Sequence, residues 1–259
     1  MMNKIIVITS GKGGVGKTTT AINLGAAINY FEKDVLVIDG NLSTPNIGVH
    51  LGSPEVPINL NHVLSGKAEP KEAVYKHESG LKIMPSSLSI KELKKIKTEK
   101  LKSFKKDFKD LSDYIIVDSA AGLGIEAVSA IELADELIVV TNAEMPAVTD
   151  ALKLIKLAEE MKKPIMGVIV TRVRKNKSEM RPNVVRDMLE VPIIGMIPED
   201  ANIQKSISLR NPLIYTNPKS KASRAYKEIA AKLTNTQYDS DNDKETILER
   251  IAVVFGWRG

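Results

Sequence analysis

Residues 11–20 read GKGGVGKTTT and directly follow a short apolar run, KIIVITS (residues 4–10). The stretch matches the pattern G-x-x-x-x-G-K-[ST], in which glycines let successive backbone N–H groups face the oxygens of a phosphate. The helix expected after the loop adds the partial positive charge of its N-terminus. The pattern therefore predicts a phosphate-binding loop between a first strand and a first helix.

Two side chains of this loop have distinct predicted tasks. Lys17 would neutralise the β- and γ-phosphates of ATP, and the Thr18 hydroxyl would bind Mg²⁺, so the expected cofactors are ATP or ADP and Mg²⁺. The residues expected to bind the nucleotide here are Gly11, Lys12, Gly13, Gly14, Val15, Gly16, Lys17, Thr18 and Thr19. The second lysine, Lys12, stands where the pattern accepts any residue, so its presence needs a separate explanation.

Six further apolar runs follow along the chain, at residues 34–40, 81–86, 114–119, 136–142, 165–172 and 192–198. They are continuous rather than alternating, which is typical of strands covered on both faces. Amphipathic segments such as 18–31, 125–134 and 148–161 lie between them. We expect a doubly wound α/β fold of the P-loop NTPase type, a mostly parallel sheet of about seven to eight strands with helices on both faces.

The composition excludes several classes of chemistry. The chain has 259 residues and no cysteine, which excludes disulfides, thiolate metal sites, cysteine nucleophiles and an iron–sulfur cluster held by this chain. Its three histidines are scattered and form no zinc-site spacing. The net charge of +5 is milder than that of a typical nucleic-acid domain.

Two aspartates at strand ends are candidate metal residues. Asp118 ends the run YIIVD, where an aspartate of a phosphate-loop protein helps to hold Mg²⁺. Asp39 ends VLVID and could join the same metal shell through water. Each could instead cap the next helix or stabilise a turn. Together with Thr18 they form the predicted metal site.

The segment 91–109, KELKKIKTEKLKSFKKDFK, is rich in lysine. Its apolar residues recur at roughly helical spacing, which predicts a solvated outer helix with lysines on the exposed face. The alternative is a surface that binds nucleic acid or acidic lipid.

We expect a single ATPase domain over residues 1–233, a flexible polar linker over 234–244 and a C-terminal amphipathic helix over 245–259. In the last segment, apolar residues recur on one helical face and Trp257 stands where an interfacial aromatic would, which predicts a membrane anchor. The alternative is a terminal helix that packs on the domain.

The stretches GKGGVGKTT, VLVIDGNLSTPN, YIIVDSAAG, TNAEMPAVTDA, VTRV and IIGMIPED occur in this order. Together they resemble the MinD/ParA family of deviant Walker ATPases, and its MinD branch most closely, from the first strand to about residue 233. The resemblance implies a dimer that encloses two ATP molecules, in which Lys12 of each subunit reaches the phosphates bound to the other. Otherwise Lys12 touches only its own phosphates or solvent.

The resemblance also implies two switch segments, residues 39–46 with Asn46 near the phosphates and residues 118–122. The family usually has a second acidic residue where this chain has Asn41, and Ala120 replaces a common proline. An amide can orient a water but cannot take its proton. The expected catalytic residues are therefore Lys12, Lys17 and Asn41, and ATP hydrolysis to ADP and phosphate should be slow.

By the same resemblance, adenine would lie between two turns. The residues expected around it are Thr171, Arg172, Pro198, Glu199 and Asp200. Asp150 matches a position near the signature lysine and could hold Lys12 when ATP is absent, or could simply face solvent in the first turn of its helix.

The function implied by the resemblance is a switch in which Mg·ATP drives homodimerisation and peripheral membrane binding and slow hydrolysis resets the state. It implies a cytoplasmic protein on the inner face of the cell membrane, an activating or cargo protein as partner, and a role in placing the division site or a polar structure. The alternatives are a ParA-like partition ATPase that binds the nucleoid, with nucleic acid the less favoured partner, and a non-hydrolysing ATP-dependent scaffold.

Overall fold

The computed structural model describes residues 3–94, 96–174 and 179–240, and within them an eight-stranded sheet forms the centre of the molecule. The strand order is β3-β4-β2-β5-β1-β6-β7-β8, and every neighbouring pair is parallel except β3 with β4. The strands are β1 (Lys4–Ser10), β2 (Val35–Gly40), β3 (Tyr75–Lys76), β4 (Lys82–Met84), β5 (Tyr114–Ala121), β6 (Glu136–Asn142), β7 (Ile165–Val173) and β8 (Ile193–Pro198). The predicted fold class is confirmed.

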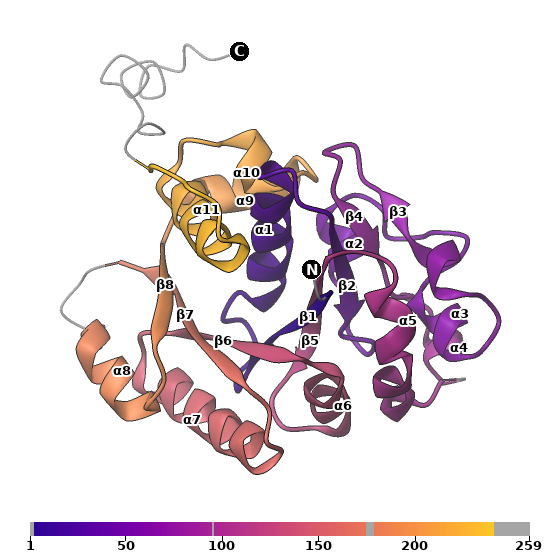
Figure 1. The fold of residues 1–259 in the computed structure, drawn as a ribbon, viewed down its shortest axis with the longest axis horizontal. Helices are drawn as coiled ribbons and strands as arrows, with labels where there is room; N and C mark the ends of the chain where they lie inside the picture. The colour runs from indigo at the N-terminus through magenta and orange to yellow at the C-terminus, as the bar shows by residue number, and fades with distance from the viewer. Residues whose placement is uncertain (1–2, 95, 175–178, 241–259) are drawn as a thin grey trace.

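Helices connect the strands and cover both faces of the sheet, as Figure 1 shows. They are α1 (Lys17–Tyr30), α2 (Ile47–His50), α3 (Leu60–Leu64), α4 (Ile90–Leu93), α5 (Lys105–Lys109), α6 (Ile125–Leu133), α7 (Met145–Glu160), α8 (Pro182–Leu189), α9 (Ala201–Ser208), α10 (Leu213–Thr216) and α11 (Lys221–Thr234). Two 3₁₀ segments complete the set, η1 (Pro70–Ala73) and η2 (Thr98–Phe104).

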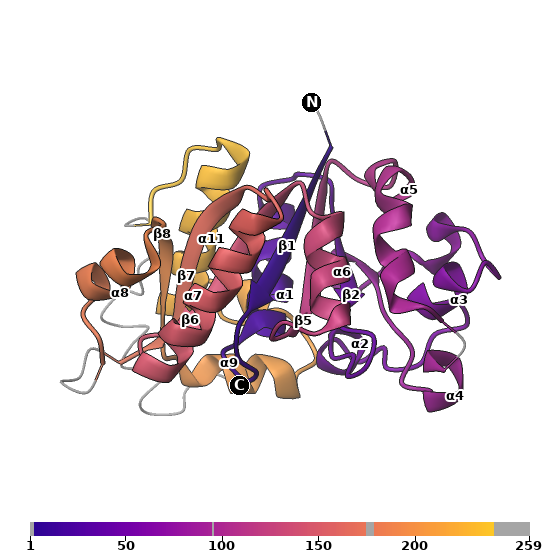
Figure 2. The ribbon, with the colours of Figure 1, turned by 90° about the horizontal axis from the view of Figure 1, so that it is seen from below.

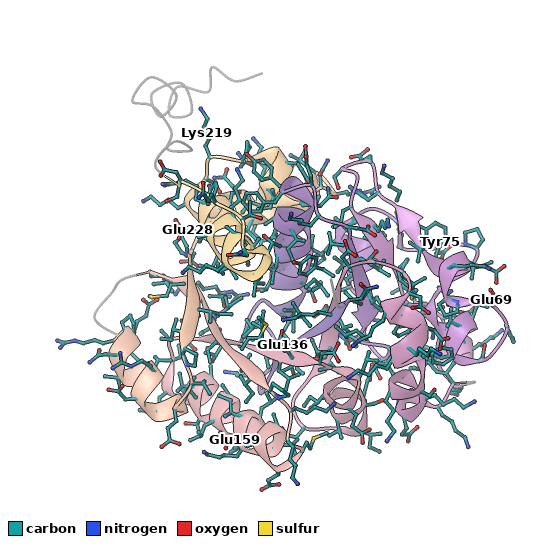
Figure 3. All side chains as sticks on the ribbon, in the orientation of Figure 1. Glu69, Tyr75, Glu136, Glu159, Lys219 and Glu228 are labelled. Atoms are coloured by element: carbon teal, nitrogen blue, oxygen red, sulfur yellow. The ribbon has the colours of Figure 1, made fainter. Side chains whose placement is uncertain are left out.

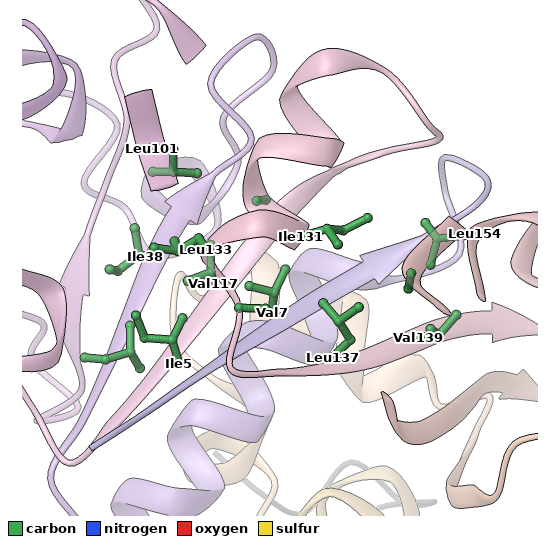
Figure 4. Packing of buried hydrophobic residues seen from close by; sticks show 14 of the residues in the cluster. Ile5, Val7, Ile38, Leu101, Val117, Ile131, Leu133, Leu137, Val139 and Leu154 are labelled. Carbon is green, nitrogen blue, oxygen red and sulfur yellow. The ribbon is translucent and has the colours of Figure 1, made fainter. Parts of the chain in front are cut away.

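The continuous apolar runs are explained by burial on both faces of the sheet. In β1, Ile5 and Val7 join the cluster that includes α6 and α7, while Ile6 and Ile8 join the cluster that includes α1 and α11. Figure 2 gives the second view of these layers, and Figure 4 shows Ile5 and Val7 in the first cluster. Charged side chains such as Glu69 and Glu159 lie at the rim (Figure 3). Because β1 lies between β5 and β6, its carboxyl end opens at the middle of the sheet.

The lysine-rich segment is not the single outer helix that its periodicity predicted. It is divided into α4, η2 and α5, and Lys97 has an extended backbone (φ −102, ψ 111) before η2. Lysines three and four residues apart repel one another along a continuous helix, which favours the interruption. Leu101 and Phe108 are nevertheless fully buried, and Phe108 stacks on Phe104 with ring centroids 5.8 Å apart. The segment is therefore anchored to the core by its apolar side chains.

The last described helix ends close to the predicted end of the domain. Helix α11 ends at Thr234, and Asn235 has the left-handed conformation (φ 51) that terminates a helix. Beyond it, the ring of Tyr238 packs edge-on against Phe31 with centroids 5.6 Å apart. The predicted anchor over 245–259 and residues 241–244 of the predicted linker lie outside the described residues. In residues 3–240, apart from the gaps at 95 and 175–178, no helix has both the length and the apolar character that crossing a membrane requires.

We expect Phe108→Ala to lower the free energy of unfolding by about 3–5 kcal/mol, because it removes a fully buried aromatic ring. Lys106→Ala on the same helix, where the side chain is exposed, should change it by less than about 0.5 kcal/mol. Urea unfolding followed by circular dichroism measures both. Equal effects of the two substitutions would contradict the anchoring of α5.

Candidate functional site

The phosphate loop connects β1 to α1 at the carboxyl edge of the sheet, and its backbone requires glycine at specific positions. Gly14 and Gly16 have positive φ angles of 78 and 93, a conformation that residues with a Cβ rarely adopt. A Cβ on Gly11 would lie 2.1 Å from the backbone oxygen of Asp150 in α7. The loop is therefore packed directly against α7, and any side chain at position 11 would push it out of place.

Two polar residues on neighbouring strands fix the loop from its other side. The Thr171 hydroxyl, at the end of β7, donates to the backbone oxygen of Val15 at 2.6 Å. The Asn142 side-chain amide, at the end of β6, donates to the Thr171 hydroxyl at 2.9 Å. Sequence reasoning missed Asn142, although its place at the end of a strand was a signal. Asn142, Thr171 and Val15 together form a clamp that links β6 and β7 to the phosphate loop.

Lys17, Thr18 and Asp118 come together as the sequence predicted. Lys17 is only 8% exposed, and burial lowers its pKa, with the Asp118 charge opposing the shift. The Thr18 hydroxyl donates to Asp118 Oδ2 at 2.5 Å. Burial raises the pKa of Asp118 to about 6, while the Thr18 hydrogen bond and the charge of Lys17 oppose the rise.

The oxygens in this group fit a magnesium ion. Asp118 is fully buried, and its Oδ1 atom has no hydrogen-bond partner among the described residues. A buried carboxylate oxygen without a partner is costly unless a cation or water satisfies it. A carboxylate and a hydroxyl are the hard oxygen ligands that Mg²⁺ prefers, usually together with several waters. Thr18 and Asp118 are therefore suited to hold Mg²⁺ beside a nucleotide.

Asp39 is also fully buried, but its carboxylate is used by the loop that follows β2. Its Oδ2 atom accepts from the backbone N–H groups of Asn46 and Ile47, both at 2.9 Å, and its Oδ1 atom accepts from that of Asn41 at 3.3 Å. Burial and the Asp118 charge raise the pKa of Asp39 well above its usual range, while these N–H groups oppose the rise. Asp39 therefore holds the loop that follows β2 in place, and its share in a metal shell stays a prediction.

Asn41 lies beside the phosphate loop with its side chain already engaged. Its amide oxygen accepts from the Thr44 hydroxyl at 3.0 Å, and Asn46 donates to the Thr44 backbone oxygen at 2.7 Å. Asn41, Asn46, Lys17 and Thr18 all line one cavity of about 510 Å³. Asn41 and Asn46 thus lie at the same cavity as the phosphate loop.

A second cavity, of about 540 Å³, adjoins the first and shares Gly16, Thr19, Arg172 and Gln204 with it. All five residues expected around adenine line this cavity, which are Thr171, Arg172, Pro198, Glu199 and Asp200. Gln204 and Tyr226 also line it and were missed, because nothing in their local sequence indicates a ligand. The two cavities give a nucleotide room for its phosphates at the loop and for its base between β7, β8 and α9.

The environment of Lys12 differs from that of Lys17 in exposure and in contacts. Its side chain is exposed and makes no hydrogen bond or ion pair within the described part of the chain, and only its backbone oxygen is engaged, by the Ser10 hydroxyl at 2.8 Å. The Asp150 carboxylate pairs with Lys153 at 3.3 Å. The alternative in which Asp150 holds Lys12 is therefore not the arrangement seen here.

Comparison with known proteins gives a consistent result. The family model described as the CobQ/CobB/MinD/ParA nucleotide binding domain matches residues 6–213. The ATP-binding protein MJ0547 of Methanocaldococcus jannaschii is 38% identical over 261 residues, covering 100% of this chain and 99% of that protein.

The septum site-determining protein MinD of Pyrococcus horikoshii, complexed with Mg-ADP, superposes with a TM-score of 0.86 at 33% identity, over 90% of this chain and 96% of that one. The MinC:MinD cell division complex of Aquifex aeolicus gives a TM-score of 0.81 at 32% identity, over 91% and 98%. The chain belongs to the CobQ/CobB/MinD/ParA family of nucleotide-binding domains.

Proposed function

We propose that this protein is a MinD-like ATPase switch, in which Mg·ATP drives homodimerisation and slow hydrolysis returns the monomer. The observation that carries the proposal is the contrast between the two loop lysines. Lys17 is buried beside the phosphate position, while Lys12 is exposed and has no partner within the described residues. One lysine serves the nucleotide of its own subunit, and the other is available to a second subunit.

The physical basis of the switch is the strength of charge interactions in an enclosed site. When two subunits close over ATP, water leaves the interface, and the attraction between the Lys12 ammonium and the γ-phosphate of the other subunit increases. ATP favours the dimer only to the extent that its affinity for the dimer exceeds its affinity for the monomer. Loss of the γ-phosphate removes that difference in affinity. The bound nucleotide therefore determines whether the two subunits associate.

Thr18 and Asp118 would hold Mg²⁺, which when bound neutralises phosphate charge. Lys17 binds the phosphates, and Asn41 orients the attacking water through its amide. Because an amide cannot accept a proton from that water, hydrolysis is slow. Thr171, Arg172, Pro198, Glu199 and Asp200 surround the adenine.

Membrane association would depend on the segment 245–259. Its polar face carries Glu245 and Glu249 against Arg250 and Arg258, so attraction to anionic lipid is weak and one copy binds poorly. Two copies in an ATP dimer bind the same membrane with a high effective concentration. The protein would then be cytoplasmic and reach the inner face of the cell membrane only in its ATP form.

Exposed apolar side chains on the nucleotide side of the molecule suit protein contacts. Leu123, Ile125 and Met145, at the beginning of α6 and α7, are 46%, 66% and 55% exposed. Such residues mark interaction sites when they cluster. They are candidates for the dimer contact and for the contact with an activating or cargo protein; the similar MinD of Aquifex aeolicus forms a complex with MinC. By likeness to MinD, the cellular role is spatial regulation of the division site or of a polar structure.

The nucleoid-binding alternative receives less support, because three of the nine lysines of the segment 91–109 are already paired within the chain. Lys102 pairs with Glu132 at 2.9 Å, and Lys105 and Lys109 both pair with Asp135 at 2.8 Å. Paired cations contribute less to the counterion release on which duplex binding depends.

Lys12→Ala should leave ADP binding unchanged and abolish ATP-driven dimerisation, because it removes a cation that acts only across the interface. Lys17→Ala is the matched control and should lose binding of both nucleotides, since its cation contacts the phosphates within the subunit. Titration calorimetry measures binding, and light scattering measures mass. A full-size ATP dimer in Lys12→Ala would refute the cross-subunit role.

Asn41→Asp should raise the single-turnover rate of ATP hydrolysis at least about tenfold, the low end of what a positioned base contributes. The aspartate keeps the acceptor for Thr44, whereas Asn41→Ala removes it and serves as the control. Quenched-flow measurement of phosphate release tests this. If the variant still binds ATP but hydrolyses it at an unchanged or lower rate, position 41 is not the missing catalytic group. If the wild type shows no turnover either with or without a partner, the non-hydrolysing scaffold is favoured.

A chain ending at Lys244 should remain in the supernatant when mixed with liposomes and ATP, while the full chain sediments, because only the full chain carries the apolar face of 245–259. A full-length variant with Ile251→Glu and Phe255→Glu should behave like the truncated chain. Thermal unfolding checks that all three are folded. Equal sedimentation of full and truncated chains would contradict the anchor.

A further inference from the structure

The loop that follows β2, residues 41–46, is held from two sides. On its inner side, the Asp39 carboxylate accepts from backbone N–H groups of the loop. On its outer side, both carboxylate oxygens of Glu126 in α6 accept from Ser43. Within the described part of the chain, Glu126 is the only residue outside 39–50 that forms a hydrogen bond with this loop. The outer contact therefore connects the loop to α6.

The contact between Glu126 and Ser43 has a defined geometry and is open to water. The backbone N–H of Ser43 donates to Oε1 at 2.9 Å, and its hydroxyl donates to Oε2 at 2.6 Å. Two hydrogen bonds to one carboxylate fix direction as well as distance. Ser43 is exposed and Glu126 partly exposed, so water can replace these bonds at little cost, whereas Asp39 is fully buried. The outer contact is therefore the one that can open and close without unfolding the loop.

The residues on either side of Ser43 determine what changes when this contact opens. Leu42 is fully buried in the core cluster that includes α6, so packing holds it in place. Thr44 is exposed, and its hydroxyl holds the amide oxygen of Asn41 at 3.0 Å. Asn41 lines the cavity beside the phosphate loop. The position of Ser43 therefore determines, through Thr44, how the Asn41 amide is oriented in that cavity.

Glu126 also lies next to the loop that follows β5. Ala121 of that loop lines the same cavity as Asn41, and α6 begins four residues later, at Ile125. A carboxylate in the first turn of a helix is stabilised by the partial positive charge of the helix N-terminus. Glu126 thus links the two loops that border the phosphate position.

We infer that Glu126 is a positioning residue for ATP hydrolysis, which holds the Asn41 amide in one orientation through Ser43 and Thr44. This inference rests on the proposed function, in which Asn41 orients the attacking water. Glu126 does not line the cavity itself, so it acts only through the loop. When the contact opens, Thr44 and the amide are free to turn, and fewer molecules are ready for attack. The rate of hydrolysis then follows the fraction of molecules in which the contact is closed.

Glu126→Ala should lower the single-turnover rate of ATP hydrolysis about tenfold, the effect of one charge-assisted hydrogen bond on the loop equilibrium, and leave ATP affinity unchanged. Glu126→Gln should stay within about threefold of the wild type, because its amide oxygen accepts from the Ser43 N–H and its amide nitrogen donates to the Ser43 hydroxyl. Glu132→Ala is the matched control on the same helix, since its carboxylate pairs with Lys102, and it should change neither quantity. Quenched flow measures the rate, and titration calorimetry measures the affinity.

Ser43→Ala removes only the hydroxyl contact and tests whether the two residues act together. Alone, it should lower the rate less than Glu126→Ala does, and added to Glu126→Ala it should lower the rate no further. Losses that multiply in the double variant would overturn the inference. A rate in Glu126→Gln as low as that in Glu126→Ala would overturn it as well, because the carboxylate would then act by its charge rather than by holding the loop.

Hydrogen exchange gives a readout that does not need turnover. In the protein bound to ADP, the backbone amides of residues 41–46 should exchange faster in Glu126→Ala than in the wild type, and at the wild-type rate in Glu126→Gln. Equal exchange in wild type and Glu126→Ala, or faster exchange with an unchanged rate of hydrolysis, would overturn the inference. Faster exchange in a protein that hydrolyses no ATP in any variant would support the positioning of the loop and refute the ATPase proposal, so the two failures are distinguishable.

Discussion

Two buried carboxylates on neighbouring strands impose the constraint on which the rest of the site depends. Asp39 and Asp118 lie in register on β2 and β5 and are both fully buried. Burial of two like charges this close favours their neutral forms, so each needs specific partners to remain charged. Asp39 receives three backbone N–H groups, while Asp118 receives a hydroxyl and a nearby ammonium. Their partners separate their tasks: Asp39 organises a loop, and Asp118 keeps an oxygen for a cation.

The same constraint explains why the two loop lysines are not equivalent. Lys17 can be buried only because Asp118 lies nearby and because phosphates would add further negative charge. Lys12 has no such environment, since the nearest part of α7 presents a backbone oxygen to Gly11 and the Asp150 carboxylate is paired with Lys153. Because Lys12 is exposed, its ammonium keeps its hydration and carries no desolvation penalty within the subunit, whereas Lys17 carries one that nearby negative charge must offset.

The sheet and the phosphate loop could be predicted because their signals are local. Continuous apolar runs identified seven of the eight strands, and the spacing of Gly11, Gly16 and Lys17 identified the loop. The two-residue strand β3 is too short to give a pattern. The prediction of one helix over the lysine-rich segment was wrong, because helical spacing of apolar residues does not show where repulsion between lysines interrupts a helix. The place of Asn142 at a strand end marked it as a candidate, but its contact with Thr171 depends on β6 lying beside β7, and strand order is not contained in any local pattern.

Helix α1 joins the phosphate loop to the aromatic contacts that follow α11. It begins with Lys17 in the phosphate loop and ends at Tyr30, whose ring lies 4.1 Å from the Lys227 ammonium of α11. Tyr238 packs on the adjacent Phe31. Helix α1 packs along α11, so one continuous element joins the phosphate loop to the Tyr30–Phe31 end. The fold therefore ties the helix that begins in the phosphate loop to α11 and to Tyr238, the last aromatic side chain of the described residues.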